Sequence, residues 1–223
     1  MTAIALVAMP EGFIIGADGL RRHTSTAVVS TEGQKVFGFT NEQITLAYAW
    51  CGTTVLIDKI NEEYVFFNFS AETAESLKGA TGGDLTIYMR SFCSTLRDRL
   101  VSANLPSSED DWSMGYFGKQ TPRMIVCGYF NKQSFLAKIE VVWNDGGMAL
   151  SLAWLTPEKK LRAFTGGTKS TDKLTRLPID IGDARSLVHE FIDCNRGETV
   201  GGKIHVALVS PDSFSWLDPP SGV

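Results

Sequence analysis

The strongest constraint on the fold lies at the start of the chain, where two short apolar segments follow each other across a turn. They run from Ala3 to Ala8 and from Phe13 to Ala17, and the four residues between them, Met9-Pro10-Glu11-Gly12, include both Pro and Gly. Short apolar runs bounded by turn residues are typical of buried strands. The sequence therefore predicts that the chain opens with two consecutive strands of a buried sheet.

Similar β-prone runs recur in three later parts of the chain. We expect strands over Ala27 to Ser30, Lys35 to Thr40, Ile44 to Cys51, Arg123 to Phe130, Phe135 to Trp143, Met148 to Leu155, Leu161 to Phe164, Lys203 to Ser210 and Phe214 to Leu217.

Four segments between these strands have helical patterns. Apolar residues three and four apart predict a helix over Thr53 to Val65. A second helix is expected after Gly82-Gly83, with Asp84 as its N-cap and an apolar stripe of Leu85, Tyr88, Met89, Phe92, Leu96 and Leu100. Two further helices are expected after Gly167 and after Asp183, the last burying Leu187, Val188, Phe191 and Ile192.

The resulting order is strands, two helices, strands, two helices, strands. Two antiparallel sheets, each covered by a helix pair, would bury all of these apolar faces. We therefore predict an α+β fold, a four-layer αββα sandwich, formed by residues 1–223 as a single domain.

Composition and charge exclude several functions. The net charge of −4 gives no basic footprint for nucleic acid. No run of about eighteen apolar residues predicts a membrane span, and no signal-peptide pattern is seen, so we expect a cytoplasmic protein. The four cysteines and three histidines lack metal-ligand spacing. We expect no metal or cofactor, buried reduced cysteines, and histidines at surface or hydrogen-bonded positions.

Thr2 is a candidate nucleophile. If Met1 is removed, which a small second residue permits, the freed α-amine of Thr2 lies beside its own hydroxyl. An α-amine has a pKa of about 7.7–8.0, so it is partly neutral at cytosolic pH and can accept the hydroxyl proton. Threonine is common at position two in other proteins, so this residue alone does not establish the chemistry.

Two further residues, Asp18 and Lys35, strengthen the interpretation of Thr2 as a nucleophile. Asp18 ends the second apolar run, in Gly16-Ala17-Asp18-Gly19, and Lys35 begins a later strand. With Thr2, their order and spacing resemble the β-type proteasome subunits, a family of N-terminal-nucleophile hydrolases. The resemblance covers essentially the whole chain, and the sequences Asp18-Gly19 and Thr165-Gly166-Gly167 resemble the bacterial heat-shock-locus protease subunit (HslV) most.

The resemblance implies a threonine peptidase. Thr2 would attack a peptide carbonyl, Lys35 held charged by Asp18 would favour the alkoxide, and the Gly52 N–H would bind the oxyanion. Thr165 would replace a supporting serine, and Trp50 would lie at the base of a shallow specificity pocket. The family also implies peptide or unfolded-protein substrates, a homo-oligomeric ring and a possible ATP-dependent unfoldase partner, with no membrane or nucleic-acid partner.

The sequence departs from this family where two polar supports would stand. Gly197 and Val200 occupy those positions, and Glu198 could substitute for one only with a shift in alignment. Three hypotheses therefore stay open: a threonine peptidase, a proteasome-fold subunit with a structural or regulatory role and no turnover, and an amidase acting on a small acyl compound.

Overall fold

A computed structural model describes residues 2–22, 28–52, 55–60, 63–103, 121–145, 147–159, 161–165, 176–198 and 200–222. The chain divides into two compact units. The first comprises residues 1–51, 125–137 and 154–223, and the second comprises residues 52–124 and 138–153. Each unit is described by itself below.

The first sheet of the structure contains both strands of the opening hairpin. Its order is β12-β1-β2-β13-β14, and every neighbouring pair is antiparallel. Met9 pairs with Gly12 around the turn at Pro10-Glu11, so the predicted opening hairpin is confirmed. The strands are β1 (Ala3–Met9), β2 (Gly12–Asp18), β12 (Arg162–Thr165), β13 (Ile204–Val209) and β14 (Phe214–Asp218).

A second sheet has the order β11-β10-β9-β6-β5. Its members are β5 (Val36–Thr40), β6 (Ile44–Cys51), β9 (Arg123–Phe130), β10 (Gln133–Asn144) and β11 (Gly147–Leu155), and a short separate ribbon joins β3 (Arg21–Arg22) to β4 (Val28–Ser30). These bounds agree with the predicted strands to within two residues. The two antiparallel sheets and their helices confirm an α+β sandwich.

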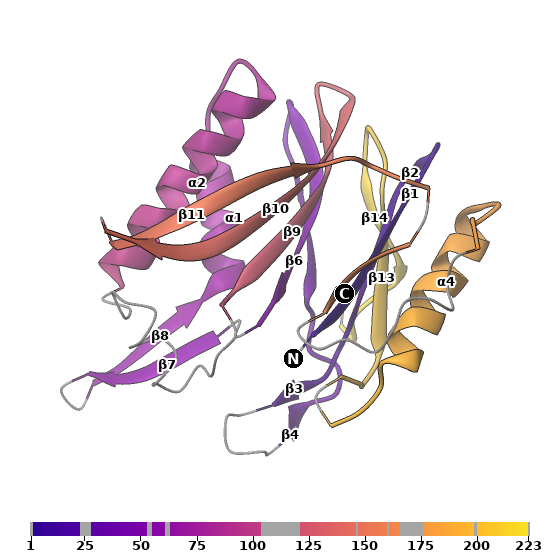
Figure 1. The fold of residues 1–223 in the computed structure, drawn as a ribbon, viewed down its shortest axis with the longest axis horizontal. Coiled ribbons are helices and arrows are strands. Elements are labelled where there is room, and N and C mark those ends of the chain that lie inside the picture. Colours follow the sequence, from indigo (N-terminus) through magenta and orange to yellow (C-terminus); the bar gives the residue numbers. More distant parts are fainter. Residues whose placement is uncertain are drawn as a thin grey trace. The chain divides into compact units, whose positions relative to one another are not determined.

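Alternation along β1 explains how the first sheet is buried on both faces. Ile4 and Leu6 join an apolar cluster with residues of the second sheet, including Val36, Ala47 and Leu136. We call the sheet face that carries this cluster the inner face. The alternate β1 residues face the opposite way, into a cluster with the helix α4 (Ile181–Cys194). Figure 1 shows α4 lying beside this sheet. The predicted stripe of α4 is buried, although the helix begins at Ile181, before Asp183, with Asp180 as its N-cap.

The second unit contains two consecutive helices, α1 (Phe69–Gly79) and α2 (Leu85–Ser102). Asp84 caps α2 by accepting a hydrogen bond from the backbone N–H of Ile87 at 2.8 Å, as predicted. The predicted stripe is buried except for Leu85, which is partly exposed in the first turn. Asn68 caps α1 by accepting hydrogen bonds from the N–H groups of Ser70 and Ala71. The start of this unit was not predicted correctly.

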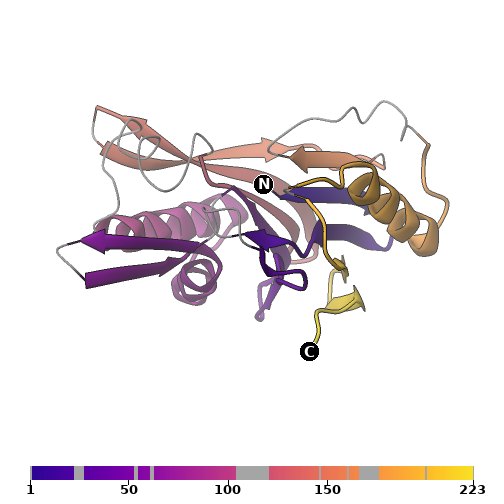
Figure 2. The same cartoon turned by 90° about the horizontal axis from the view of Figure 1, so that it is seen from below.

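The helix predicted over Thr53 to Val65 is wrong. The described part of this segment is an antiparallel hairpin of β7 (Val55–Ile60) and β8 (Glu63–Asn68), visible as a two-stranded ribbon in Figure 2. The segment is rich in β-branched and aromatic residues, which favour strands, and its apolar spacing fits both periods. The first helix of this unit, α1, begins at Phe69, after the hairpin, and was not predicted.

Three other expectations have separate outcomes. The helix expected after Gly167 lies outside the described residues. Cys51 and Cys127 are buried as predicted, whereas Cys194 is exposed, because it ends α4 on the solvent side. No helix in the described part of the chain is long and apolar enough to cross a membrane.

Candidate active site

The site predicted from the sequence lies at the end of the first sheet where β1 begins. Thr2 immediately precedes β1 and is 3% exposed. The next residue, Ala3, pairs with Thr165 of β12 on one side, and Ile4 pairs with Ala17 of β2 on the other. Thr2 is therefore fixed by a strand that is hydrogen-bonded along both edges.

Asp18 is the centre of a buried hydrogen-bond network. Its Oδ1 accepts a bond from the Ala3 N–H at 2.8 Å. Its Oδ2 accepts bonds from the N–H groups of Gly201 at 3.2 Å and Leu20 at 3.3 Å. The Asp18 side chain is fully buried. A buried carboxylate needs partners for its lone pairs, and these bonds supply them from three separate parts of the chain.

Lys35 completes this network with a charge. Its Nζ donates to Asp18 Oδ2 at 2.9 Å, and its side chain is only 5% exposed. A buried lysine normally needs an opposite charge, because desolvation of an ammonium group is expensive. The structure therefore brings together Asp18, Lys35 and the residue next to Thr2.

The segment before Lys35 reaches this position by running against the ends of β2 and β13. Gly33 N–H donates to the Gly19 carbonyl at 2.8 Å, and Lys203 N–H donates to the Thr31 carbonyl at 2.7 Å. Gly202, with φ of +75°, allows this approach, since a Cβ there would lie 2.1 Å from the Thr31 oxygen. The Gly201-Gly202 pair therefore positions both the carboxylate network and the lysine.

Sequence reasoning missed the first of those two glycines as a member of the site. Gly201 donates its N–H to Asp18 and accepts a bond from the Leu20 N–H at 2.8 Å. Its only signal in the sequence is the glycine pair, Gly201-Gly202, that stands before an apolar strand. Every residue except proline has a backbone N–H, so the residue type does not show which of them donates to the site.

The remaining predicted residues fall in different places. Thr165 ends β12 opposite Ala3. Gly52 follows β6 as the first residue of the second unit, with φ of +96°, a conformation that favours glycine. Trp50 is 1% exposed in β6. The inner-face cluster takes Ala47, Ala49 and Cys51 from that strand, so alternation turns Trp50 to the opposite face.

The positions where the family would place two polar supports carry no buried polar side chain in the described part of the chain. Gly197 and Glu198 are exposed. Val200 is buried in the apolar cluster beneath α4. Because it is exposed to solvent, Glu198 does not take the place of a buried support. Among the predicted site residues that the structure describes, the charged ones are Asp18 and Lys35.

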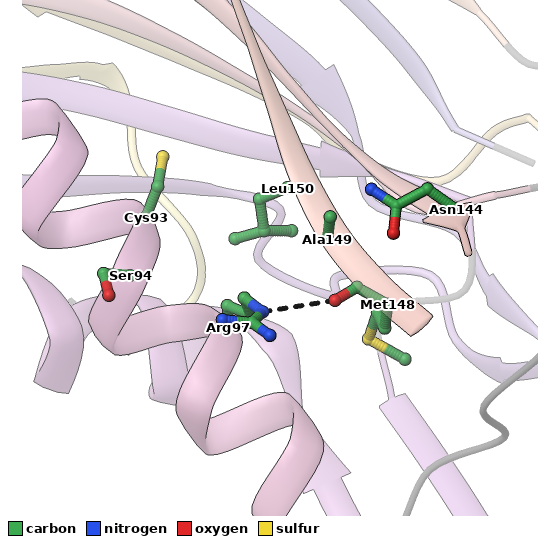
Figure 3. Close-up of a pocket in the computed structure, with 7 residues that line it drawn as sticks. All are labelled: Cys93, Ser94, Arg97, Asn144, Met148, Ala149 and Leu150. Carbon is green, nitrogen blue, oxygen red and sulfur yellow. Dashed lines mark hydrogen bonds between the residues drawn. The ribbon is translucent and has the colours of Figure 1, made fainter. Parts of the chain in front are cut away.

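A cavity of about 400 Å³ lies in the second unit, between α2 and β11. Figure 3 shows Arg97 at this cavity donating a hydrogen bond to the Met148 carbonyl, at 3.2 Å. Cys93 also lines it, and burial raises the pKa of that thiol to about 12, so it is not a nucleophile at neutral pH. None of the predicted site residues lines this cavity.

Comparison with known proteins identifies the fold. No family model and no curated protein match the sequence. Solved structures of Anbu do match: a variant from Hyphomicrobium sp. strain MC1 has a TM-score of 0.64 at 11% identity, covering 100% of this chain and 89% of that one.

Two further Anbu structures give the same result. Anbu from Yersinia bercovieri, described as an ancestral beta-subunit, has a TM-score of 0.61 at 10% identity, covering 97% of this chain and 87% of that one. A helical assembly of the Anbu complex from Pseudomonas aeruginosa has a TM-score of 0.61 at 11% identity, covering 100% and 88%. The chain therefore has the proteasome-like fold of these Anbu structures.

Proposed function

We propose that this chain is a threonine peptidase whose nucleophile is Thr2, freed by removal of Met1. The Thr2 hydroxyl attacks a peptide carbonyl while the α-amine takes its proton. The amine then gives a proton to the leaving amino group as the C–N bond breaks, leaving an ester on Thr2. Water hydrolyses this ester by the same route, which returns the free hydroxyl.

The observation that carries the proposal is the buried Asp18–Lys35 pair at the start of β1. The pair lies at 2.9 Å, and the same carboxylate binds the N–H of the residue after Thr2. A positive charge held there favours a neutral α-amine and a developing alkoxide over their protonated forms. It also stabilises charge in the transition state without reorganisation.

Other parts of the proposal rest on the resemblance alone. These are the Gly52 N–H as oxyanion donor, Thr165 as a supporting hydroxyl, and the nearer likeness to the heat-shock-locus subunit. The same source gives peptide or unfolded-protein substrates and an ATP-dependent unfoldase as partner. The helical assembly formed by Anbu supports the proposal that copies of this chain associate into a closed or helical oligomer.

Intact mass spectrometry tests the nucleophile. Purified protein is measured before and after treatment with a peptide epoxyketone, which reacts with both the hydroxyl and the amine of an N-terminal threonine. We expect loss of Met1 and an adduct localised to Thr2. Thr2→Ala should take no adduct, whereas Thr45→Ala, which alters another buried threonine of the first unit, should retain it.

A non-catalytic role is the second candidate, because one observation favours it. The two positions where polar supports were expected hold a glycine and a buried valine. Folded, assembled protein that begins at Thr2 and takes no probe would favour this candidate. Turnover of small amides but not of peptides, lost in Thr2→Ala, would instead indicate an amidase.

A further inference from the structure

The segment that follows α4 leads directly to the glycine pair of the candidate site. The helix ends at Cys194, and the pair Gly201-Gly202 stands shortly before β13. Between them, Val200 is buried in the apolar cluster beneath α4. We call the described part of residues 195–203 the α4–β13 connection. Its conformation decides where the backbone groups of the two glycines lie.

The glycine pair is the part of this connection that most needs restraint. Glycine has more accessible backbone conformations than any other residue, and two in succession multiply that freedom. The Gly201 N–H must nevertheless stay 3.2 Å from Asp18 Oδ2, since it is one of three backbone donors to that carboxylate. Gly202 must also keep its φ of +75° where the chain passes Thr31. Groups that hold the two glycines in place therefore contribute to the geometry of the site.

Arg196 is a side chain that binds this pair. Its Nη1 donates to the Gly202 carbonyl at 3.1 Å, and its Nε donates to Asp193 Oδ1 at 2.5 Å. Asp193 lies in the last turn of α4, so the guanidinium group joins the end of that helix to the glycine pair. A guanidinium group is planar with its donors in a fixed arrangement, so the bond to Asp193 orients the bond to Gly202.

The departure from the proteasome family makes this link important here. Gly197 and Val200 stand where that family would place polar supports, and neither has a polar side chain. Arg196 directly precedes the first of these positions. Among the described residues, Arg196 and Asp18 are the two side chains that form hydrogen bonds with the glycine pair.

We propose that Arg196 is a positioning residue of the site, which acts on Asp18 through the backbone of the glycine pair. Arg196 fixes the Gly202 carbonyl, and the neighbouring Gly201 N–H donates to Asp18. The same carboxylate binds the residue after Thr2 and the lysine of the buried ion pair. The role of Arg196 in the reaction rests on the proposed function, whereas the link from Arg196 to Asp18 does not.

Hydrogen exchange tests the link without any need for turnover. Exchange at the Gly201 N–H is measured at pH 7.5 by mass spectrometry, with fragmentation that resolves single residues. Arg196→Met keeps an unbranched side chain but removes its donors. We expect exchange at Gly201 to become at least about tenfold faster in this variant. Exchange at Leu6, which is paired on both sides in β1, should change by less than about twofold.

Arg185→Met is the matched control. Arg185 is also an arginine of α4, is 46% exposed like Arg196, and also pairs with an aspartate. Its partner, Asp218, ends β14, so this ion pair joins α4 to a strand and not to the α4–β13 connection. Arg185→Met should therefore leave exchange at Gly201 unchanged.

A second variant tests the path through the guanidinium group. Asp193→Ala removes the group that orients Arg196, so it should also accelerate exchange at Gly201, but by less than Arg196→Met. Both substitutions act through one bond to Gly202. The double variant should therefore exchange within about twofold of Arg196→Met alone.

Steady-state kinetics test the role in the reaction. When Gly201 is no longer fixed, Asp18 loses a donor and holds the groups around Thr2 less firmly. In Arg196→Met we expect kcat to fall at least about fivefold while KM changes by less than about twofold. The rate is expressed per site titrated with the peptide epoxyketone, so unfolded protein does not contribute. Arg185→Met should keep the kcat of the wild type.

Each outcome has a distinct meaning. Unchanged exchange at Gly201 in Arg196→Met, or equal acceleration at Gly201 and Leu6, would overturn the proposal. Faster exchange at Gly201 with an unchanged kcat would overturn the positioning role. Faster exchange at Gly201 in a protein that takes no epoxyketone would support the link and reject the peptidase. If Arg196→Met does not fold, Asp193→Ala carries the same comparisons.

Discussion

Removing the charge of Asp18 should destabilise the folded chain severely. In Asp18→Asn, the amide oxygen can face either the Ala3 N–H or the group of donors around Oδ2, but not both. In either orientation, an amide N–H meets another donor. The Lys35 ammonium group, 5% exposed, also loses its countercharge.

The expected loss follows from the burial of both partners. Breaking a buried ion pair by removing one partner reduces the free energy of unfolding by about 3–5 kcal/mol. Domains have about 5–15 kcal/mol in total, so this one substitution removes a large share of the stability. Lys35→Met should lose less than Asp18→Asn, because three backbone N–H groups still donate to the carboxylate. Asp18→Asn/Lys35→Met should lose at least about 2 kcal/mol less than the sum of the two single losses.

Urea unfolding followed by tryptophan fluorescence measures all four proteins. The protomer concentration is kept constant, because assembly changes apparent stability. Asp212→Asn is the matched control, since Asp212 pairs with Lys132 at 3.1 Å with both side chains exposed, and it should unfold like the wild type. A loss below about 1 kcal/mol for Asp18→Asn, or additivity of the two single effects within about 0.5 kcal/mol, would refute this account.

Two further predictions concern the close contact at Gly202 and the reactivity of the cysteines. Gly202→Ala should lower the free energy of unfolding by at least about 2 kcal/mol, because its Cβ would clash with the Thr31 oxygen, whereas Gly197→Ala meets open space and should unfold in urea like the wild type. A thiol reagent at pH 7.5 should modify exposed Cys194 first and Cys93 much more slowly, since Cys93 is only partly exposed and burial raises its pKa to about 12. Peptide mapping by mass spectrometry checks the order, and equal rates at the two cysteines would contradict it.

The sequence predicts the strands of the first sheet well because their signal is local. Ala3 to Ala8 and Phe13 to Ala17 are apolar, too short for a typical helix and bounded by a turn, so their length and flanking residues indicate strands. The helix prediction over Thr53 to Val65 is wrong because two signals in that segment conflict. Its apolar spacing fits a helix, while its β-branched and aromatic residues favour strands. Periodicity alone cannot choose between those outcomes when the segment is short.

Some contacts of the candidate site could be predicted from the sequence and others could not. The spacing of Asp18 and Lys35 predicted their ion pair only through resemblance to a family, because the contact joins separate segments. The expectation of a surface or hydrogen-bonded position is wrong for His205, which is fully buried and whose ring nitrogens have no hydrogen-bond partner among the described residues. The burial of His205 could not be predicted, because it depends on the neighbouring strand that pairs Ala17 with it. Gly201 could not be predicted either, since its contribution is a backbone N–H.

The long sequence separation within the Asp18 network has a consequence for synthesis. Asp18 and the Gly201 N–H are 183 residues apart, although they are 3.2 Å apart in the folded chain. A ribosome makes the chain from its N-terminus, so Thr2, Asp18 and Lys35 all emerge long before their last partner. The carboxylate can acquire its full set of donors only after residue 201 has been made. The topology thus delays completion of the site until the segment that leads into β13 has been synthesised.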